Sequence, residues 1–186
     1  MKGGGAMHWF SFFLLYSFLG YLLERSFAKV TGSPRQVRKC FLLLPLCPVY
    51  GAAMVVFLSS TDVFALSLPH LIFRGALFCT VVEYLFHLWY DLIFRVRFWD
   101  YGERFGNLGG RISLPFSLLW GILSALAARV IHPLLAPIAA AAPPLLLWLL
   151  LLLLTADAVL TAALLLRYHD TELLTLRAVV RHLEEE

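Results

Sequence analysis

Glu83, His87 and Asp91 follow one another at intervals of four residues inside a single apolar stretch of the chain. On a helix this spacing places the three titratable side chains on one face, from the middle of the stretch toward its end. An acid at the centre of an isolated membrane helix costs about 2.5 to 3.5 kcal/mol on insertion scales, so such groups usually face partners or a water-filled cavity. We therefore expect this face to look toward other helices and not toward lipid.

Three kinds of chemistry suit this row of residues. A proton relay or a pocket for a polar solute is favoured, because ionisable residues inside a membrane are functional by default. A metal site built from Glu83 and His87, with Asp91 or Glu24 added, is less well supported because no Cys or second close His completes a familiar ligand set. The third alternative is a structural cluster of hydrogen bonds that holds the helices together. We predict no metal ion and no cofactor.

Polar residues from other parts of the chain can join this row. Glu24 closes the first apolar stretch, Tyr50 lies within the second, and Arg111 stands at the start of the fourth. The connection before Arg111 is rich in aromatic residues, which anchor segments at the membrane surface. Its glycines permit turns in which backbone amides converge, so we expect Arg111 and this connection to receive an anionic group. Asp157, in the last apolar stretch, is ambiguous and could simply bond to a neighbouring helix.

The composition indicates the class of protein that carries these residues. Of the 186 residues, 61% are hydrophobic and 15% are charged, against about 45 to 50% and roughly 25% in soluble domains. A soluble globule of this size could not bury so much apolar surface, so the excess must face lipid. The net charge of +3 is too weak to indicate nucleic acid. We predict an integral membrane protein surrounded by membrane lipids, with no nucleic-acid partner.

The three cysteines, Cys40, Cys47 and Cys79, all lie in apolar runs. Their odd number and their spacing match neither a disulfide framework nor a zinc site. We interpret all three as small core residues.

A membrane-spanning helix needs about 20 mainly apolar residues, and five stretches of the sequence qualify. The expected fold class is therefore all-α, a polytopic transmembrane bundle of about five helices. The stretches cover residues 9–28, 40–58, 68–94, 112–131 and 145–166. The first is interpreted as a retained helix and not as a cleaved signal peptide, because its apolar part is too long and it ends in Glu24 and Arg25.

Lysine and arginine residues indicate the orientation, because they concentrate in cytoplasmic loops. On one side, the predicted bundle collects the basic residues of the first and third connections and of the segment after the last helix. These are Arg25, Lys29, Arg35, Arg38, Lys39, Arg95, Arg97, Arg104, Arg111, Arg167, Arg177 and Arg181. The opposite side holds Lys2 and Arg129. We predict an inner-membrane protein with its amino terminus outside and its carboxyl terminus in the cytoplasm.

Two segments outside these stretches carry separate expectations. Four prolines within residues 132–144 disfavour a regular helix, so an outer connection is predicted there, with a re-entrant segment as the alternative. After residue 167, apolar residues recur at helical spacing. They are Leu173, Leu176, Val180 and Leu183. We predict a transmembrane bundle over residues 1–167 and an amphipathic cytoplasmic helix over residues 168–186, with a frayed end as the alternative.

The frame Leu-Pro, four residues, an aromatic residue and Gly occurs twice, over residues 44–51 and 114–121. Each copy follows a basic connection and opens an outward-going helix, and each follows a helix with an acid near its inner end, Glu24 and Asp91 respectively. Two parallel helix-pair repeats with one extra helix would explain this pattern. Chance similarity between such apolar segments is the alternative.

A series of short motifs runs through the first four stretches. They are an aromatic-rich run that ends in Glu24, then Cys47-Pro-Val-Tyr-Gly51, Val82-Glu-Tyr84, Trp99-Asp-Tyr101, Asn107-Leu-Gly-Gly-Arg111 and Leu119-Trp-Gly121. Together they resemble the ABC-transporter permease family of the CmpB type over about residues 10–130. The chain departs from the family pattern at residues 38–45, where the expected glycines are missing.

The resemblance carries expectations about site residues and partners. It places the family's polar signature on Glu24, Tyr50, Glu83, Asp100, Tyr101, Asn107 and Arg111. Because the sequence contains no Walker A motif, any ATPase that serves such a permease would be a separate polypeptide. Glycine-bearing helices are also compatible with a homodimer.

Three hypotheses about function remain. The leading one is a permease-like protein that transports or binds a small polar or ionic solute in a polar cavity open to the cytoplasm, lined by Glu24, Glu83, His87, Asp91 and Arg111. The second is an intramembrane enzyme acting on a lipid-borne substrate, with Glu83 or His87 as general base and Arg111 on a head-group phosphate. The third is a non-catalytic accessory membrane subunit.

Overall fold

The computed structural model describes residues 5–32 and 40–174. Every regular element in these ranges is a helix, as predicted. The helices are α1 (Ala6–Val30), α2 (Pro48–Ser59), α3 (Leu68–Trp89), α4 (Leu114–Leu126), α5 (His132–Ala141) and α6 (Pro144–Tyr168), with π-helical turns η1 (Tyr90–Phe94) and η2 (Ala127–Ile131). The all-α prediction is therefore confirmed.

Four of these helical stretches are long and apolar enough to cross a bilayer. They are Ala6–Val30, Leu68–Phe94, Leu114–Ala141 and Pro144–Tyr168, with lengths of 25 to 28 residues. About 20 residues suffice to span the hydrocarbon core. The chain is a multi-pass membrane protein with a helical bundle.

The predicted second span, residues 40–58, is wrong in its first half. Only α2 is helical, and its 12 residues are fewer than a bilayer crossing requires. Pro45 and Pro48 explain the late start, because each lacks an amide hydrogen and disfavours helical geometry in the residue before it. Composition could not reveal this, since residues 40–43 are as apolar as a lipid-facing helix.

Residues 40–47 instead form an irregular buried segment, and the carboxylate of Asp157 holds it. The amides of Leu43 and Leu44 donate to the two Asp157 oxygens at 3.1 and 2.9 Å, and the amide of Cys47 donates to the carbonyl of Ser17 at 2.9 Å. Non-helical backbone at membrane depth is tolerated where protein surrounds it and satisfies its polar groups. Asp157 does this for the irregular segment.

Cys40 and Cys47 form a disulfide across this segment, so the interpretation of all three cysteines as core thiols is wrong for these two. Cys79 is a buried free thiol, as expected. The pairing was not evident from the sequence because it depends on the bend of residues 40–47, which brings the two Cα atoms to 4.9 Å.

The prediction of a non-helical connection over residues 132–144 is also wrong. α4 continues through η2 into α5, and only Ala142 and Pro143 separate α5 from α6. Pro133 and Pro144 lie in the first turns of their helices, where a missing amide hydrogen costs little. Pro137 is accommodated inside α5.

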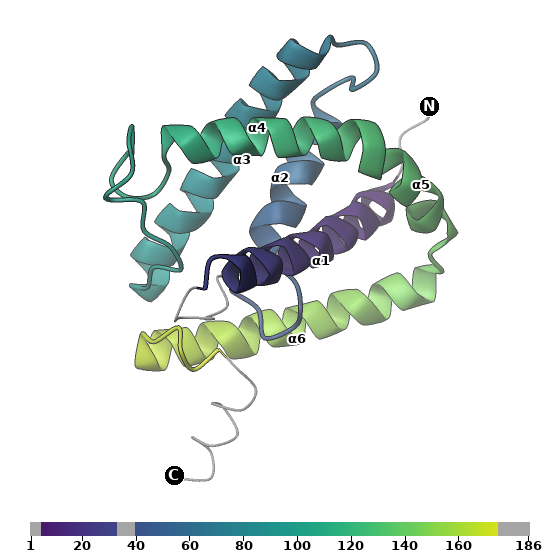
Figure 1. Cartoon of the computed structure of the whole chain (residues 1–186). Helices are drawn as coiled ribbons and strands as arrows, with labels where there is room; N and C mark the ends of the chain where they lie inside the picture. Colours follow the sequence, from purple (N-terminus) through teal and green to yellow (C-terminus); the bar gives the residue numbers. More distant parts are fainter. Residues whose placement is uncertain (1–4, 33–39, 175–186) are drawn as a thin grey trace.

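Five helices form a closed ring, and α6 lies outside it. α1 packs on α2, α2 on α3, and α3 on α4, while α5 returns to α1. Figure 1 shows α6 on the side of α1 opposite to α4, and α6 also contacts η1. At the end of α6, the His169 ring bonds to the carbonyl of Phe94 at 2.7 Å. The described residues end at residue 174, so residues 175–186 of the predicted helix over 168–186 lie outside them.

Candidate functional site

A cavity of about 430 Å³ lies inside the ring, between α1 and α4, with α2 and α3 behind it. Most of its walls are aliphatic and aromatic side chains. Its polar lining residues include Glu24, Tyr50, Glu83, Tyr101, Trp120 and Ser124. Small-molecule sites have volumes of about 300 to 1,000 Å³ and few polar groups in mainly apolar walls, so the cavity has the size and character of a binding site.

Glu24 enters this cavity from α1 with Tyr50 as its partner. The Tyr50 hydroxyl donates to the Glu24 carboxylate at 2.6 Å. Gly20, one turn before Glu24, permits this approach, because a Cβ at this position would collide with the Tyr50 ring. A charge-assisted hydrogen bond of this kind is about twice as strong as one between neutral groups.

Glu83 enters the same cavity from α3 and is 6% exposed. The Tyr101 hydroxyl and the Trp120 indole N–H each donate to its carboxylate at 3.0 Å. Tyr101 comes from the connection after η1, and Trp120 comes from α4. Burial raises the pKa of Tyr101 above its usual range, and the Glu83 carboxylate raises it further. The phenol therefore stays protonated and remains a donor.

The two acids occupy equivalent places in two helix pairs. In α1 and α2, Gly51 packs on the Phe13 carbonyl, and the preceding Tyr50 donates to Glu24. In α3 and α4, Gly121 packs on the Ile72 carbonyl, and the preceding Trp120 donates to Glu83. Phe13 and Ile72 each lie eleven residues before the acid of their helix.

These recurring contacts correct the sequence comparison of the two halves. The acid that corresponds to Glu24 is Glu83 and not Asp91, which lies beyond it in η1. Choosing the acid near the inner end of each preceding helix selected the wrong acid in the second pair, because Glu83 in α3 is followed by the more terminal Asp91 in η1. Matching the contacts places both acids in one cavity.

Arg111 and Asp91 lie beside the cavity in a separate polar network. The Arg111 guanidinium binds the Asp91 carboxylate at 2.8 Å, and Arg97 approaches the same carboxylate at 3.6 Å. His87 is 1% exposed, and its Nε2 lies 3.1 Å from the carbonyl oxygen of Trp99. The Trp99 indole in turn donates to the Arg111 carbonyl at 3.0 Å. This network ties the end of α3 to the connection that carries Tyr101.

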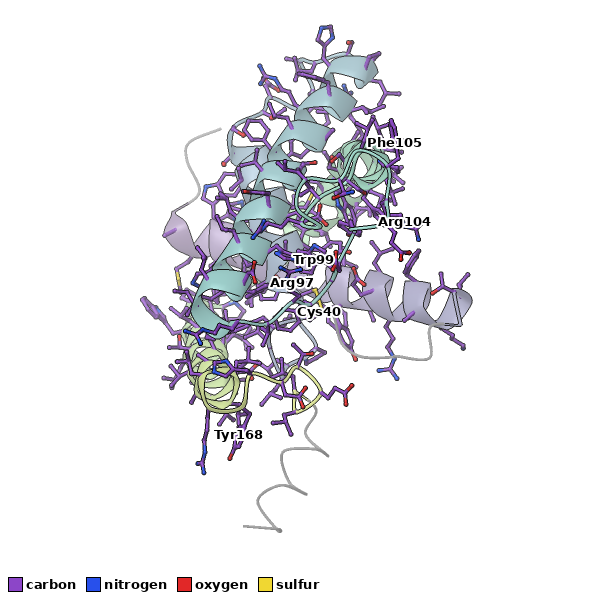
Figure 2. The ribbon with its side chains drawn as sticks, turned by 90° about the vertical axis from the view of Figure 1, so that its left-hand side faces the viewer. Cys40, Arg97, Trp99, Arg104, Phe105 and Tyr168 are labelled. Atoms are coloured by element: carbon purple, nitrogen blue, oxygen red, sulfur yellow. A yellow bond between two sulfur atoms is a disulfide. The ribbon has the colours of Figure 1, made fainter. Side chains whose placement is uncertain are left out.

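Asp100 and Asn107 shape that connection. The Asp100 carboxylate accepts the Gly102 amide at 2.8 Å, and the Asn107 side chain donates to the carbonyls of Gly102 and Arg104 at 3.0 and 2.9 Å. In Figure 2, Arg104 and Phe105 stand apart from Arg97 and Trp99, at the far end of the connection. The polar residues within the connection thus fix its fold, which holds Tyr101 against Glu83.

The family model described as "Putative ABC-transporter type IV" matches residues 11–162. The chain belongs to this family. Comparison with curated proteins and with solved structures finds no match. The family match runs from α1 into α6 and so includes every helix that lines the cavity. Family membership and the long apolar helices fit a membrane transport protein.

For this transporter family member, the structure divides the residues singled out in the sequence into two groups. Glu24, Tyr50, Glu83 and Tyr101 meet in the cavity. The others lie in the network beside it and are not among the cavity-lining residues: His87, Asp91, Asp100, Asn107 and Arg111. The guanidinium of Arg111, expected to receive an anionic group, binds the carboxylate of Asp91.

Sequence reasoning missed Trp120 as the second donor to Glu83. The signal was present, because Trp120 precedes Gly121 as Tyr50 precedes Gly51, and Tyr50 was already a candidate. For the metal alternative, no group of three or more His, Cys, Asp or Glu side chains that could hold an ion occurs within residues 5–32 and 40–174.

Proposed function

We propose that the protein is the membrane subunit of a transporter and that Glu24 and Glu83 bind a cationic solute or exchange protons in the cavity between α1 and α4. One observation carries this proposal: two carboxyl groups from equivalent positions in two helix pairs line one apolar cavity. Tyr50, Tyr101 and Trp120 donate hydrogen bonds to these groups without neutralising their charge. Two carboxylates that share a site repel each other, so a proton or a cation between them is favoured.

The distribution of basic residues supports a cavity near the cytoplasmic side of an inner membrane. Figure 1 shows the carboxyl-terminal ends of α1, α3 and α6 on the same side of the molecule. Arg25 and Arg167 lie at two of these ends, and Arg95 directly follows η1. Because basic residues favour the cytoplasm, we place this side inside and the amino terminus outside. Glu24, near the end of α1, then lies close to the cytoplasm.

A separate ATPase supplies the energy in this proposal, because the sequence has no phosphate-binding loop of its own. Catalysis on a lipid-borne substrate is a weaker candidate. His87 and Arg111, which it would use beside Glu83, are not among the residues that line the cavity.

Charge movement on binding tests the proposal without the ATPase. Protein reconstituted in liposomes on a solid-supported membrane is exposed to rapid jumps of H⁺, Na⁺, K⁺ or tetramethylammonium. Binding inside the membrane displaces charge, so we expect a transient current with at least one of these cations. Glu24→Gln and Glu83→Gln should abolish it, while membrane insertion is unchanged.

The matched control is Glu103→Gln, which removes an exposed carboxyl group from the connection after η1 and should leave the current unchanged. No current with any of the four cations would contradict the proposal. An unchanged current in Glu83→Gln or in Glu83→Leu would contradict the proposal equally.

A further inference from the structure

Several residues that line the cavity also have large exposed fractions. Leu22 and Phe27 of α1 and Leu119 and Leu126 of α4 line it, yet they are 42%, 46%, 40% and 51% exposed. A residue that does both lies at the opening of a cavity, and we call these four residues the side opening. α1 and α4 belong to membrane-spanning stretches, so the side opening runs along apolar helices, and Phe27, beyond Glu24 and Arg25, marks its end near the side that we place in the cytoplasm.

Aromatic rings line the cavity next to the two acids. Tyr50 and Trp120 meet edge to face with centroids 5.4 Å apart, and Tyr101 stacks on Phe116 at 4.6 Å. All four residues line the cavity. Ring faces attract cations, most strongly where water is excluded, and quaternary ammonium groups are recognised in this way. Alkyl groups can also pack against the same rings.

We propose that the occupant is an alkylammonium-type organic cation that enters sideways from the bilayer between α1 and α4. This inference rests on the proposed function and names the class of its solute. The ammonium group lies among the aromatic rings with Glu24 and Glu83 as counter-charges, and the alkyl chain extends along the side opening. An apolar entrance would not stabilise an inorganic cation, and two carboxylates would not stabilise a neutral lipid.

Protection of the acids from a carbodiimide tests this class. Dicyclohexylcarbodiimide modifies protonated carboxyl groups in apolar surroundings, and peptide mass mapping reports the rate at Glu24 and Glu83. The protein is held in phosphatidylglycerol nanodiscs, which lack an ammonium headgroup. Octyltrimethylammonium should slow labelling at a concentration at least about tenfold below that of tetramethylammonium, since each buried methylene contributes about fourfold. Sodium chloride and 1-octanol should not protect.

Two tryptophan substitutions test the route. Leu119 lines the cavity, whereas the neighbouring Leu118 is 55% exposed and is not among the lining residues. Leu119→Trp narrows the side opening and should delay protection by octyltrimethylammonium severalfold, while Leu118→Trp should not. Equal effects of the two substitutions would overturn sideways entry.

The remaining outcomes separate this inference from the proposed function. Protection by tetramethylammonium or sodium alone would overturn the alkylammonium class and leave cation binding in place. Protection by lysophosphatidylethanolamine as well would support the class and identify membrane lipid as one source. Labelling that falls as protein density rises, without any cation, would mean that a second copy covers the side opening, and the inference would fail. No cation protection together with no binding current would defeat both.

Discussion

Asp157 and the pair Glu24–Glu83 are acids within or at the ends of apolar helices, but the structure uses them differently. Asp157 is 8% exposed and accepts the amides of Leu43 and Leu44. Its two shorter bonds come from the backbone of a segment closed by a disulfide, and the Thr161 hydroxyl donates a longer one at 3.5 Å. Glu24 and Glu83 accept hydrogen bonds from side chains and line a cavity.

The difference lies in what the hydrogen-bond donors of each carboxylate would lose if that carboxylate were removed. Removing Asp157 leaves two backbone amides without an acceptor inside the protein, where an unsatisfied group is costly. The donors to Glu24 and Glu83 are instead side chains that themselves line the cavity. An acid that holds backbone is therefore structural, whereas the two acids that share the cavity are those to which we assign the proposed binding of a solute.

The largest expected effect is the loss of stability in Asp157→Ala. Two charge-assisted bonds to buried amides disappear, at about 1.5 to 3 kcal/mol each, so the thermal midpoint of the monodisperse detergent-solubilised protein should fall steeply. Asp62→Ala is the matched control, because Asp62 also accepts two amides, those of Phe64 and Ala65, but in an exposed turn. If the thermal midpoint fell no further in Asp157→Ala than in Asp62→Ala, the structural role of Asp157 would be contradicted.

Gly51→Ala and Gly121→Ala should cause the next largest effect, and in equal measure. A Cβ at Gly51 would collide with the Phe13 carbonyl, and one at Gly121 with the Ile72 carbonyl. Overpacking of this kind costs about 1 to 3 kcal/mol, measured as a fall in thermal midpoint. At Gly5 a Cβ has open space, so Gly5→Ala should be neutral. Unequal losses at Gly51 and Gly121 would break the equivalence of the two helix pairs.

Much of the helical fold follows from the sequence, but the exceptions have a common cause. Long apolar stretches identified the spanning helices because lipid exposure requires this composition. The same composition could not show that residues 40–47 are buried by protein, or that Asp157 supplies their acceptors. Glu24, Tyr50 and Glu83 stood out as polar residues in apolar surroundings. The match of Trp120–Gly121 to Tyr50–Gly51 pointed to Trp120, but its bond to Glu83 depends on how α3 and α4 align in the fold.

A smaller effect is expected for the hydroxyl groups that line the cavity. Tyr50→Phe and Tyr101→Phe each delete one charge-assisted donor to an acid, which should lower stability by about 1.5 kcal/mol and change the carbodiimide reactivity of that acid. Tyr16→Phe is the control, because the Tyr16 hydroxyl is buried without a hydrogen-bond partner among the described residues. It should be neutral or slightly stabilising. Equal behaviour of all three would show that the donors do not support the acids.

The smallest effect is expected for Asp91→Asn. Asp91 and Arg111 are 23% and 22% exposed in their side chains, and ion pairs that solvent reaches contribute at most about 1 kcal/mol. The thermal midpoint should fall slightly at low salt and not at high salt. Loss of the cation-induced current in Asp91→Asn would instead show that Asp91 takes part in cation binding.

The most direct test of the central distinction is the map of carbodiimide adducts on the wild-type protein in a membrane. All three acids lie in apolar surroundings, but only two face a space that a reagent or solute can enter. From this distinction we predict dicyclohexylcarbodiimide adducts on Glu24 and Glu83 and none on Asp157. Adducts on Asp157 with both glutamates unmodified would contradict it.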